Sequence, residues 1–249
     1  MRVRPRTAIG LGAAIAVFGA AGAAFAATTV NPPAGTPNLA QMVLAPADLA
    51  SSEGVAGSGF ITPPQDFSAA YAATLFASAT SDGVKYASVT SEVAVAPEVS
   101  DATAHLAYEY SHFYSPAGRR WFVRAVAKVS PKHGPNHLTA RNFAYSGVGP
   151  AGIGDGSYIE TLTLRDRHRR AQQVYLVYVT GSYYIYVNLA GTVNETVPQS
   201  DAVALGRTVA AHIVAVLGAS GATGVSATAG TTSPASASDT RSGGATERA

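Results

Sequence analysis

The stretch VYLVYVTGSYYIYVNL, residues 174 to 189, decides the fold of this chain. β-Branched and aromatic residues fill both of its halves, which is typical of β-strands. Gly181-Ser182 separates the halves as a two-residue turn with glycine first, the arrangement of a tight β-hairpin. The sequence therefore predicts two antiparallel strands, Val174–Val179 and Tyr183–Leu189, and the turn sets Val179 opposite Tyr184.

The two faces of this hairpin differ in composition. One face carries only residues suited to a core, namely Leu176, Tyr178, Ile185, Val187 and Leu189. The other face carries Tyr175, Tyr184 and Tyr186, whose rings bear hydroxyl groups. Such a face suits a platform for sugar rings or lipid, and it equally suits a surface covered by a helix or the outer side of a half-buried sheet.

Patterns on either side of the hairpin predict more strands and three helices. Alternating residues predict strands over 84–96, 120–129, 137–145 and 157–165. Helical spacing after the capping residues Asp66, Ser100 and Ser200 predicts helices over 67–79, 100–114 and 201–217. The predicted fold class is α+β, a single mainly antiparallel sheet with helices packed on one face.

The two ends of the chain differ from its middle. Residues 1–26 combine Arg2, Arg4 and Arg6, an apolar run, and Ala24-Phe25-Ala26, which predicts a signal peptide and hence a secreted or extracytoplasmic protein. An uncleaved membrane anchor is the alternative, because the run is 20 residues long. We predict a lead-in linker over 27–37, one globular domain over 38–218, and a disordered tail rich in Ser, Ala, Thr and Gly over 219–249.

The composition excludes several classes of protein. The chain has 249 residues and no cysteine, which rules out disulfide scaffolds, iron–sulfur clusters and thiol nucleophiles. The formal charge of +2 includes the three arginines of the predicted signal, and the other 14 basic residues nearly balance 15 acidic residues. A near-neutral exported chain is not a general nucleic-acid binder. No cofactor is predicted.

Motifs for catalysis and metal binding are weak. The run GVGPAG over 147–152 fits the glycine spacing of a dinucleotide loop, but strand-like sequence follows where that motif needs a helix, so a glycine turn is the better interpretation. His133 and His137 lack the further ligands of a zinc site, and no metal site is predicted. His105, Glu109 and His112 are candidates for acid–base chemistry, although a solvated helix face explains them better.

Charge is segregated along the chain. Residues 27–118 sum to −7, and residues 119–170 sum to +7. The bases gather in Arg119–Lys128, on one face of a predicted strand, and in a predicted loop that holds Arg167, Arg169 and Arg170. Such a patch suits an anionic lipid or glycan of the envelope, including contact at a membrane surface. Neutralisation of one half of the fold by the other is the alternative.

The order of several short motifs carries a resemblance. They are an Asp48-Leu49 turn, Tyr71 and Phe76 in a predicted helix, the helix Ala102–Phe113, the turn Gly152–Asp155, and the closing helix Asp201–Leu217. This order resembles the extracellular sensor domains of mycobacterial serine/threonine kinases and PsbP-like lipoproteins. The resemblance implies a binding or sensing module and supplies no catalytic residues. The absence of cysteine means that the disulfide bridges of the kinase domains are missing here.

The sequence thus predicts a non-enzymatic binding module of the bacterial cell envelope for an amphipathic or anionic ligand, such as a lipid, a lipoglycan or a wall polymer. The predicted ligand-binding residues are Arg167, Arg169, Arg170, Tyr175, Tyr184 and Tyr186. Two alternatives stay open. One is a small secreted hydrolase with a site around His105, Glu109 and His112, and the other is a structural or protein-interaction module.

Overall fold

The fold was analysed in a computed structural model, which describes residues 31–50, 52, 54–76, 86–111, 115–129, 139–166 and 169–219. The predicted signal peptide and nearly all of the predicted tail lie outside these residues. Residues 31–37 of the predicted lead-in contain no helix or strand. The first helical turn, η1, begins at Leu39.

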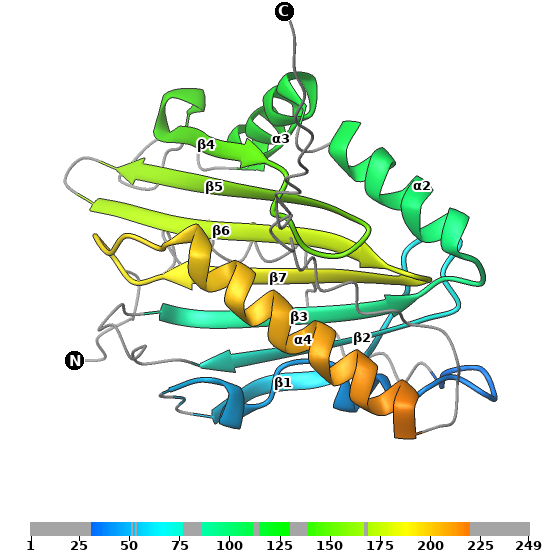
Figure 1. The fold of residues 1–249 in the computed structure, drawn as a ribbon. Helices are drawn as coiled ribbons and strands as arrows, with labels where there is room; N and C mark the ends of the chain where they lie inside the picture. Colours follow the sequence, from blue (N-terminus) through cyan, green and yellow to red (C-terminus); the bar gives the residue numbers. More distant parts are fainter. Residues whose placement is uncertain are drawn as a thin grey trace, which may run out of the picture.

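One antiparallel sheet of seven strands forms the body of the molecule, in the order β1-β2-β3-β7-β6-β5-β4 (Figure 1). Every neighbouring pair in it is antiparallel. The strands are β1 (Gly54–Ile61), β2 (Ala69–Phe76), β3 (Tyr86–Val95), β4 (Phe143–Gly149), β5 (Gly156–Asp166), β6 (Arg169–Thr180) and β7 (Tyr183–Gly191). This architecture confirms the predicted α+β class with a single antiparallel sheet.

The central hairpin, β6–β7, has the predicted register. Val179 lies opposite Tyr184, Val177 opposite Tyr186, and the turn between the strands begins at Gly181 with a φ of 54°. Asp155 fixes this turn, because its Oδ2 accepts a hydrogen bond of 2.7 Å from the backbone N–H of Gly181. The turn and the strand register are therefore local properties that the sequence specifies correctly.

Helices lie on both faces of the sheet, which corrects the expectation that they pack on one. Helix α4 (Gln199–Ala219) packs Val209 and Ile213 on the face that carries Leu176 and Ile185. Helix α2 (Val99–Glu109) packs Leu106 on the opposite face (Figure 1). The reason is that β6 and β7 bury side chains on both sides, so each face needs a cover.

Two predicted elements have the wrong type. The predicted helix over 67–79 is strand β2 in its described part, since neighbours on both sides impose a strand on a run of alanines whose own preference is helical. The predicted strand over 120–129 is part of helix α3 (Pro116–Val129). Its start resembles a standard helix N-terminus, because the Ser115 hydroxyl accepts the Gly118 N–H at 3.1 Å and proline follows.

The remaining differences concern the limits of elements. Helix α2 begins after Glu98 rather than at Ser100, and residues 112–114 of its predicted end lie outside the described residues. The predicted strand over 137–145 is a strand from Phe143 onward, as part of β4, and the short turn η4 (Ala140–Asn142) precedes it. Residues 137 and 138 lie outside the described residues. Helix α4 contains the whole of the predicted helix over 201–217.

The sheet face that packs against α4 forms an apolar core, and we call it the α4 face. Gly206 lets α4 approach the sheet, because a side chain there would meet Leu176, and its carbonyl accepts a hydrogen bond of 2.6 Å from the Tyr178 hydroxyl. The turns η1 (Leu39–Gln41) and η2 (Pro46–Asp48) cover the rest of this face. Among the described residues, α4 is the one helix whose length and apolar composition would suffice to cross a membrane.

Candidate functional site

A row of polar side chains crosses the sheet face that packs against α2, which we call the α2 face. Cross-strand pairing aligns one polar residue from each of five neighbouring strands. Directly opposite side chains in such a pair lie close enough to interact. The row is Thr74, Thr90, Asn188, Tyr175 and Glu160, and we call it the polar row.

Two buried polar atoms on or beside this row have no hydrogen-bond partner in the part of the chain that the structure describes. They are Nδ2 of Asn188, a residue only 7% exposed, and the hydroxyl oxygen of Tyr145 on β4. The Asn188 side chain lies close enough to the Tyr175 hydroxyl to lower the pKa of that hydroxyl, although burial raises it more. The Tyr175 hydroxyl itself donates to Oε1 of Gln173. Buried polar atoms in folded proteins almost always have partners, so this face departs from the rule.

Two buried carboxyl groups lie on the same face. Burial, together with the nearby Glu109 carboxyl, raises the pKa of Glu92 from 4.5 to about 7. Burial also raises the pKa of Glu160 from 4.5 to about 7, although the Arg119 guanidinium acts in the opposite direction. Burial raises the pKa of the Tyr145 and Tyr175 hydroxyls as well. Both acids are therefore close to half protonated near neutral pH.

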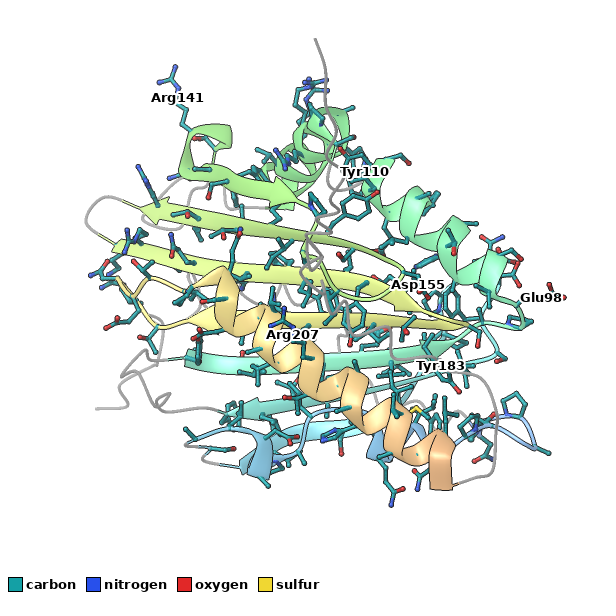
Figure 2. All side chains as sticks on the ribbon, in the orientation of Figure 1. Glu98, Tyr110, Arg141, Asp155, Tyr183 and Arg207 are labelled. Carbon is teal, nitrogen blue, oxygen red and sulfur yellow. The ribbon has the colours of Figure 1, made fainter. Side chains whose placement is uncertain are left out.

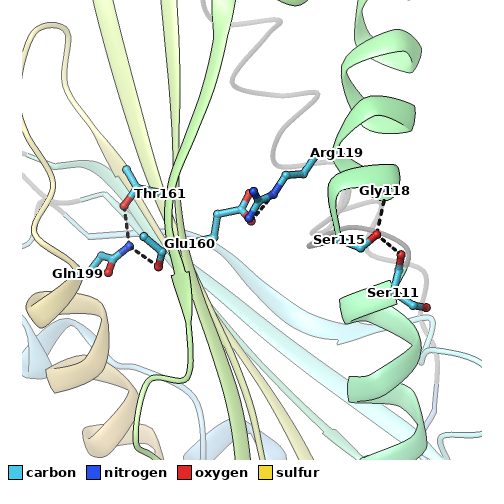
Figure 3. A network of polar contacts seen from close by, with 8 residues as sticks. Ser111, Ser115, Gly118, Arg119, Glu160, Thr161 and Gln199 are labelled. Carbon is cyan, nitrogen blue, oxygen red and sulfur yellow. Dashed lines mark hydrogen bonds and ion pairs between the residues drawn. The ribbon is translucent and has the colours of Figure 1, made fainter.

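Arg119 forms an ion pair with only one of these two carboxyl groups, that of Glu160. Its Nη2 lies 2.9 Å from Oε2 of Glu160, and its Nε donates to the same oxygen at 3.2 Å. Figure 3 shows this pair on one side of β5, while Thr161 points to the other side and meets Gln199 of α4. The Arg119 guanidinium also lies 5.2 Å from the centroid of the Tyr145 ring. For Glu92, no ion pair is found among the described residues.

The three predicted tyrosines lie on the α2 face, and helix α2 covers part of it. Tyr184 is buried, and its hydroxyl donates a hydrogen bond of 2.6 Å to Oε2 of Glu109 on α2. Tyr186 is 9% exposed and lies directly opposite Glu92. Tyr175 lies beside it, with 6.2 Å between the ring centroids. Of the two structural explanations of this face, cover by a helix therefore applies at Tyr184.

The histidine and carboxylate pair on α2 faces inward, which corrects the expectation of a solvated helix face. Nε2 of His105 lies 3.6 Å from Oε1 of Glu109. The His105 ring meets the rings of Phe67 and Tyr184 edge to face, at 5.0 and 4.9 Å between centroids. His112, the third member of the predicted group, lies outside the described residues.

The predicted arginines lie apart from the tyrosines. Arg167 is outside the described residues, and Arg169 is exposed at the start of β6. Arg170 holds the loop before α4, because its Nη2 donates to the Asn194 carbonyl at 3.2 Å and to the Thr196 hydroxyl at 2.8 Å. Six residues of strand separate Arg169 from Tyr175, which is about 20 Å. The structure thus does not bring the two predicted groups into one site, and their role in binding stays a prediction.

The glycine-rich run forms the irregular end of strand β4 and the turn that leads from it to β5. Strand β5 follows it where a dinucleotide loop would need a helix. Gly147, Gly152 and Gly154 have φ values of 67°, 66° and 65°, which agrees with the interpretation of this run as a turn that requires positive φ. Within the described ranges, no three His, Cys, Asp or Glu side chains come together as metal ligands.

Charge balance between the two halves of the chain has little support in the ion pairs of the described residues. Arg119 and Glu160 both belong to the basic segment. Asp48, in the acidic segment, meets His212 of α4, with 3.3 Å between Oδ1 and Nε2. The same imidazole lies with its Nδ1 3.2 Å from the Val43 carbonyl, so His212 is a structural histidine that joins α4 to η1 and η2.

Sequence reasoning missed the polar row and the buried acids. Strand alternation puts Thr90 and Glu92 on one side of their strand and Asn188 on the tyrosine face of the hairpin, and these were the signals available. It did not join them, because the order of strands in the sheet sets β3 beside β7 and so unites residues almost 100 positions apart.

Comparison with known proteins gives one structural likeness. No protein-family model and no curated protein sequence matches this chain. Among solved structures, the fold is similar to the extracellular domain of PknH from Mycobacterium tuberculosis, with a TM-score of 0.44 and 12% sequence identity. The match covers 71% of this chain and 98% of that one. It agrees in outline with the resemblance to kinase extracellular domains, and it assigns no role to any residue here. The resemblance to PsbP-like lipoproteins stays a prediction.

Proposed function

We propose that this protein is an exported, non-enzymatic binding module of the bacterial cell envelope, and that its α2 face binds an amphipathic ligand with a hydroxyl-rich head, such as a lipoglycan. The observation that carries the proposal is the polar row, where buried Asn188 and the neighbouring Tyr145 hold polar atoms without partners. Export follows from the predicted signal peptide.

The contrast with the α4 face supports this choice. Polar groups on the α4 face have partners, since the Ser91 hydroxyl accepts the Leu44 N–H at 2.9 Å and the Tyr178 hydroxyl donates to Gly206. Burying a polar group without a partner costs about 1–3 kcal/mol in proteins. A chain that pairs the polar groups of one face and leaves two polar atoms of the other face unpaired carries that cost where a ligand would offset it.

The chemistry of the α2 face favours hydroxyl groups over a strongly anionic head. A hydroxyl group both donates and accepts, so it can pair with the Asn188 amide, a tyrosine hydroxyl or a carboxyl group in either protonation state. The tyrosine rings offer apolar surfaces for sugar rings or chains. A ligand phosphate near Glu92 would instead meet a carboxyl that ionises more above about pH 7 and would repel it.

The test is Asn188→Leu, compared with Thr163→Val on the α4 face, where the Thr163 hydroxyl accepts the Gln172 amide at 3.1 Å. Native mass spectrometry of protein purified from its own host measures the bound ligand, and thermal melting of ligand-free protein measures stability. Asn188→Leu should lose the ligand and leave the free protein as stable or more stable, because an unpaired amide becomes apolar. Thr163→Val should be less stable, because it removes the hydrogen bond between Gln172 and the Thr163 hydroxyl. It should still bind the ligand.

Four results would contradict the proposal. The first is full ligand occupancy in Asn188→Leu. The second is an Asn188→Leu variant that melts well below wild type while Thr163→Val does not, which would make Asn188 a structural residue. If Arg169→Ser abolished binding and Asn188→Leu did not, the ligand would be an anionic one at the start of β6. A protein that carries no ligand from its host and takes up no envelope lipoglycan in titration would favour a structural or protein-interaction module.

The hydrolase alternative has one specific observation in its favour. Glu109 accepts the Tyr184 hydroxyl while His105 lies 3.6 Å from its other oxygen, so a hydroxyl, a carboxylate and an imidazole meet under α2. Turnover of ester or glycoside substrates by the wild type, lost in both Glu109→Gln and His105→Gln, would establish acid–base chemistry there. Retention of that turnover in either variant would assign it elsewhere.

A further inference from the structure

Helix α3 exposes the single tryptophan of the chain on a basic stripe. Trp121 is 59% exposed, and Arg120 and Arg124, which lie beside it along the helix, are exposed too. We call these three residues the α3 stripe. Tryptophan is a costly residue to leave in water, because it carries more apolar surface than any other side chain.

The orientation of α3 is fixed from its inner side. Gly118 and Val123 are buried, and Arg119 reaches inward to Glu160 with the distance of 2.9 Å given above. With 3.6 residues per turn, positions 120, 121 and 124 then lie on the side away from the sheet. The pairing of Arg119 with the buried acid thus turns Arg120 and Trp121 outward.

Two more arginines lie near the stripe. Arg141 and Arg165 are exposed near it, since η4 packs against α3 and the Asn142 amide donates to the Arg165 carbonyl at 2.7 Å. Figure 2 shows Arg141 pointing away from the body of the molecule at the β4 end of the sheet. Between residues 115 and 165, the carboxyl groups whose positions are described are buried Glu160 and Asp155, which lies at the distant hairpin turn.

We infer that the α3 stripe docks this protein on the surface of an anionic lipid bilayer. Arginine attracts anionic headgroups, with about 1 kcal/mol for each basic residue near the surface. Tryptophan belongs at the boundary between headgroups and acyl chains, where its ring is apolar and its N–H is polar. A bilayer offers an anionic headgroup layer for the arginines and an apolar region for the indole ring, so we commit to a bilayer and leave a soluble acidic polymer as an outcome of the test.

This surface is separate from the site of the proposed function. The α3 stripe faces solvent, whereas the polar row faces the interior between the sheet and α2. A bilayer that holds the protein would bring the α2 face close to lipids that carry hydroxyl-rich heads. The two proposals nevertheless fail independently, because Asn188 is not in the stripe and Trp121 is not in the polar row.

Trp121 provides the measurement, since the intrinsic tryptophan fluorescence of this chain comes from that residue alone. The full chain, in the form released by its secreting host, is titrated with vesicles of phosphatidylcholine with and without phosphatidylglycerol. We expect a blue shift and protection from acrylamide quenching with the anionic vesicles, and neither with phosphatidylcholine alone. The response should weaken as salt increases, because the arginine contribution is screened.

Arg120→Ser and Arg124→Ser should each weaken vesicle binding about five-fold, and the double variant about thirty-fold, which follows from about 1 kcal/mol per residue. Arg207→Ser is the matched control, because Arg207 is exposed on α4, on the other side of the sheet (Figure 2). Cosedimentation with vesicles measures these variants and Trp121→Ser, which should also bind more weakly than wild type.

The inference is overturned if anionic vesicles leave the Trp121 spectrum unchanged, or if Arg207→Ser weakens binding as much as Arg120→Ser. It is also overturned if a soluble polyanion such as heparin binds the protein through Arg120 and Arg124 while vesicles do not. That last result would assign the stripe to an acidic polymer.

Discussion

Replacing Glu92 by glutamine tests whether the buried carboxyl group on the α2 face lowers the stability of the folded protein. Glutamine keeps the size of the side chain and removes its ionisation. Burial and the neighbouring Glu109 raise the pKa of Glu92 from 4.5 to about 7 in the folded protein. At about 1.4 kcal/mol per pKa unit, this rise corresponds to about 3 kcal/mol against the ionised form.

The sign of the effect follows from proton binding. Below about pH 4.5 the carboxyl group is protonated in both the folded and the unfolded chain, so it costs nothing. Between pH 4.5 and about 7 the folded protein holds a proton that the unfolded chain has released, so stability falls as pH rises. Above about pH 7 the full cost of about 3 kcal/mol is present. Glu92→Gln should remove this dependence.

The assay is thermal or urea unfolding of ligand-free protein at pH 4 and at pH 8. At pH 8, Glu92→Gln should raise the melting temperature by roughly 6–12 °C, at about 2–4 °C for each kcal/mol in a domain of this size. At pH 4 the variant and the wild type should melt together. Glu98→Gln is the matched control, since Glu98 is exposed and its replacement should change stability little at either pH.

A Glu92→Gln variant that is less stable than wild type at pH 8 would refute this reasoning, because it would mean that the ionised carboxylate is stabilised in the fold. An equal change at both pH values would also refute it, since the effect would then come from packing. The prediction concerns the free protein alone and does not depend on which ligand binds.

Two further predictions concern the backbone and the buried ion pair. Gly154→Ala should destabilise the fold by about 3 kcal/mol or more, because it combines positive φ with a Cβ that would overlap the Val179 carbonyl. Gly152→Ala, with positive φ and open space, should cost only about 1–2 kcal/mol, and equal costs in urea unfolding would contradict this account. Arg119→Met should cost about 3–5 kcal/mol at pH 8, because it leaves Glu160 buried without its partner, and Glu160→Gln in the same chain should recover most of that loss. A double variant as unstable as Arg119→Met would show that Arg119 acts through packing instead.

The sequence predicts some residues of the candidate site and misses others. The tyrosine face of the hairpin follows from strand alternation, so the sequence predicts that Tyr175, Tyr184 and Tyr186 share a face. The acids beside them were not predicted, because Glu92 comes from a strand that only the sheet order sets beside β7. The arginines were found as a cluster, yet Arg170 serves a loop and Arg169 lies far along the strand from the tyrosines.

What the sequence determined by itself is what short-range chemistry controls. The Gly181-Ser182 turn and the period of two fix the β6–β7 hairpin with its register, and helical spacing fixes α4. Ser115-Pro116 is also typical of a helix N-terminus, but the alternation of the following residues favours a strand. These elements depend on neighbours in the chain, so local patterns specify them.

Only the tertiary structure decided which segments form strands of the sheet and which form helices that pack on it. An alanine-rich run such as Ala69–Phe76 has little intrinsic preference for a strand, and its pairing between β1 and β3 overrides the helical tendency. The sequence leaves open whether the tyrosine face is exposed or covered, and the structure shows that α2 covers it at Tyr184. Burial, and with it the raised pKa of Glu92, arises from contacts between distant segments, and that is why no local pattern in the sequence could reveal it.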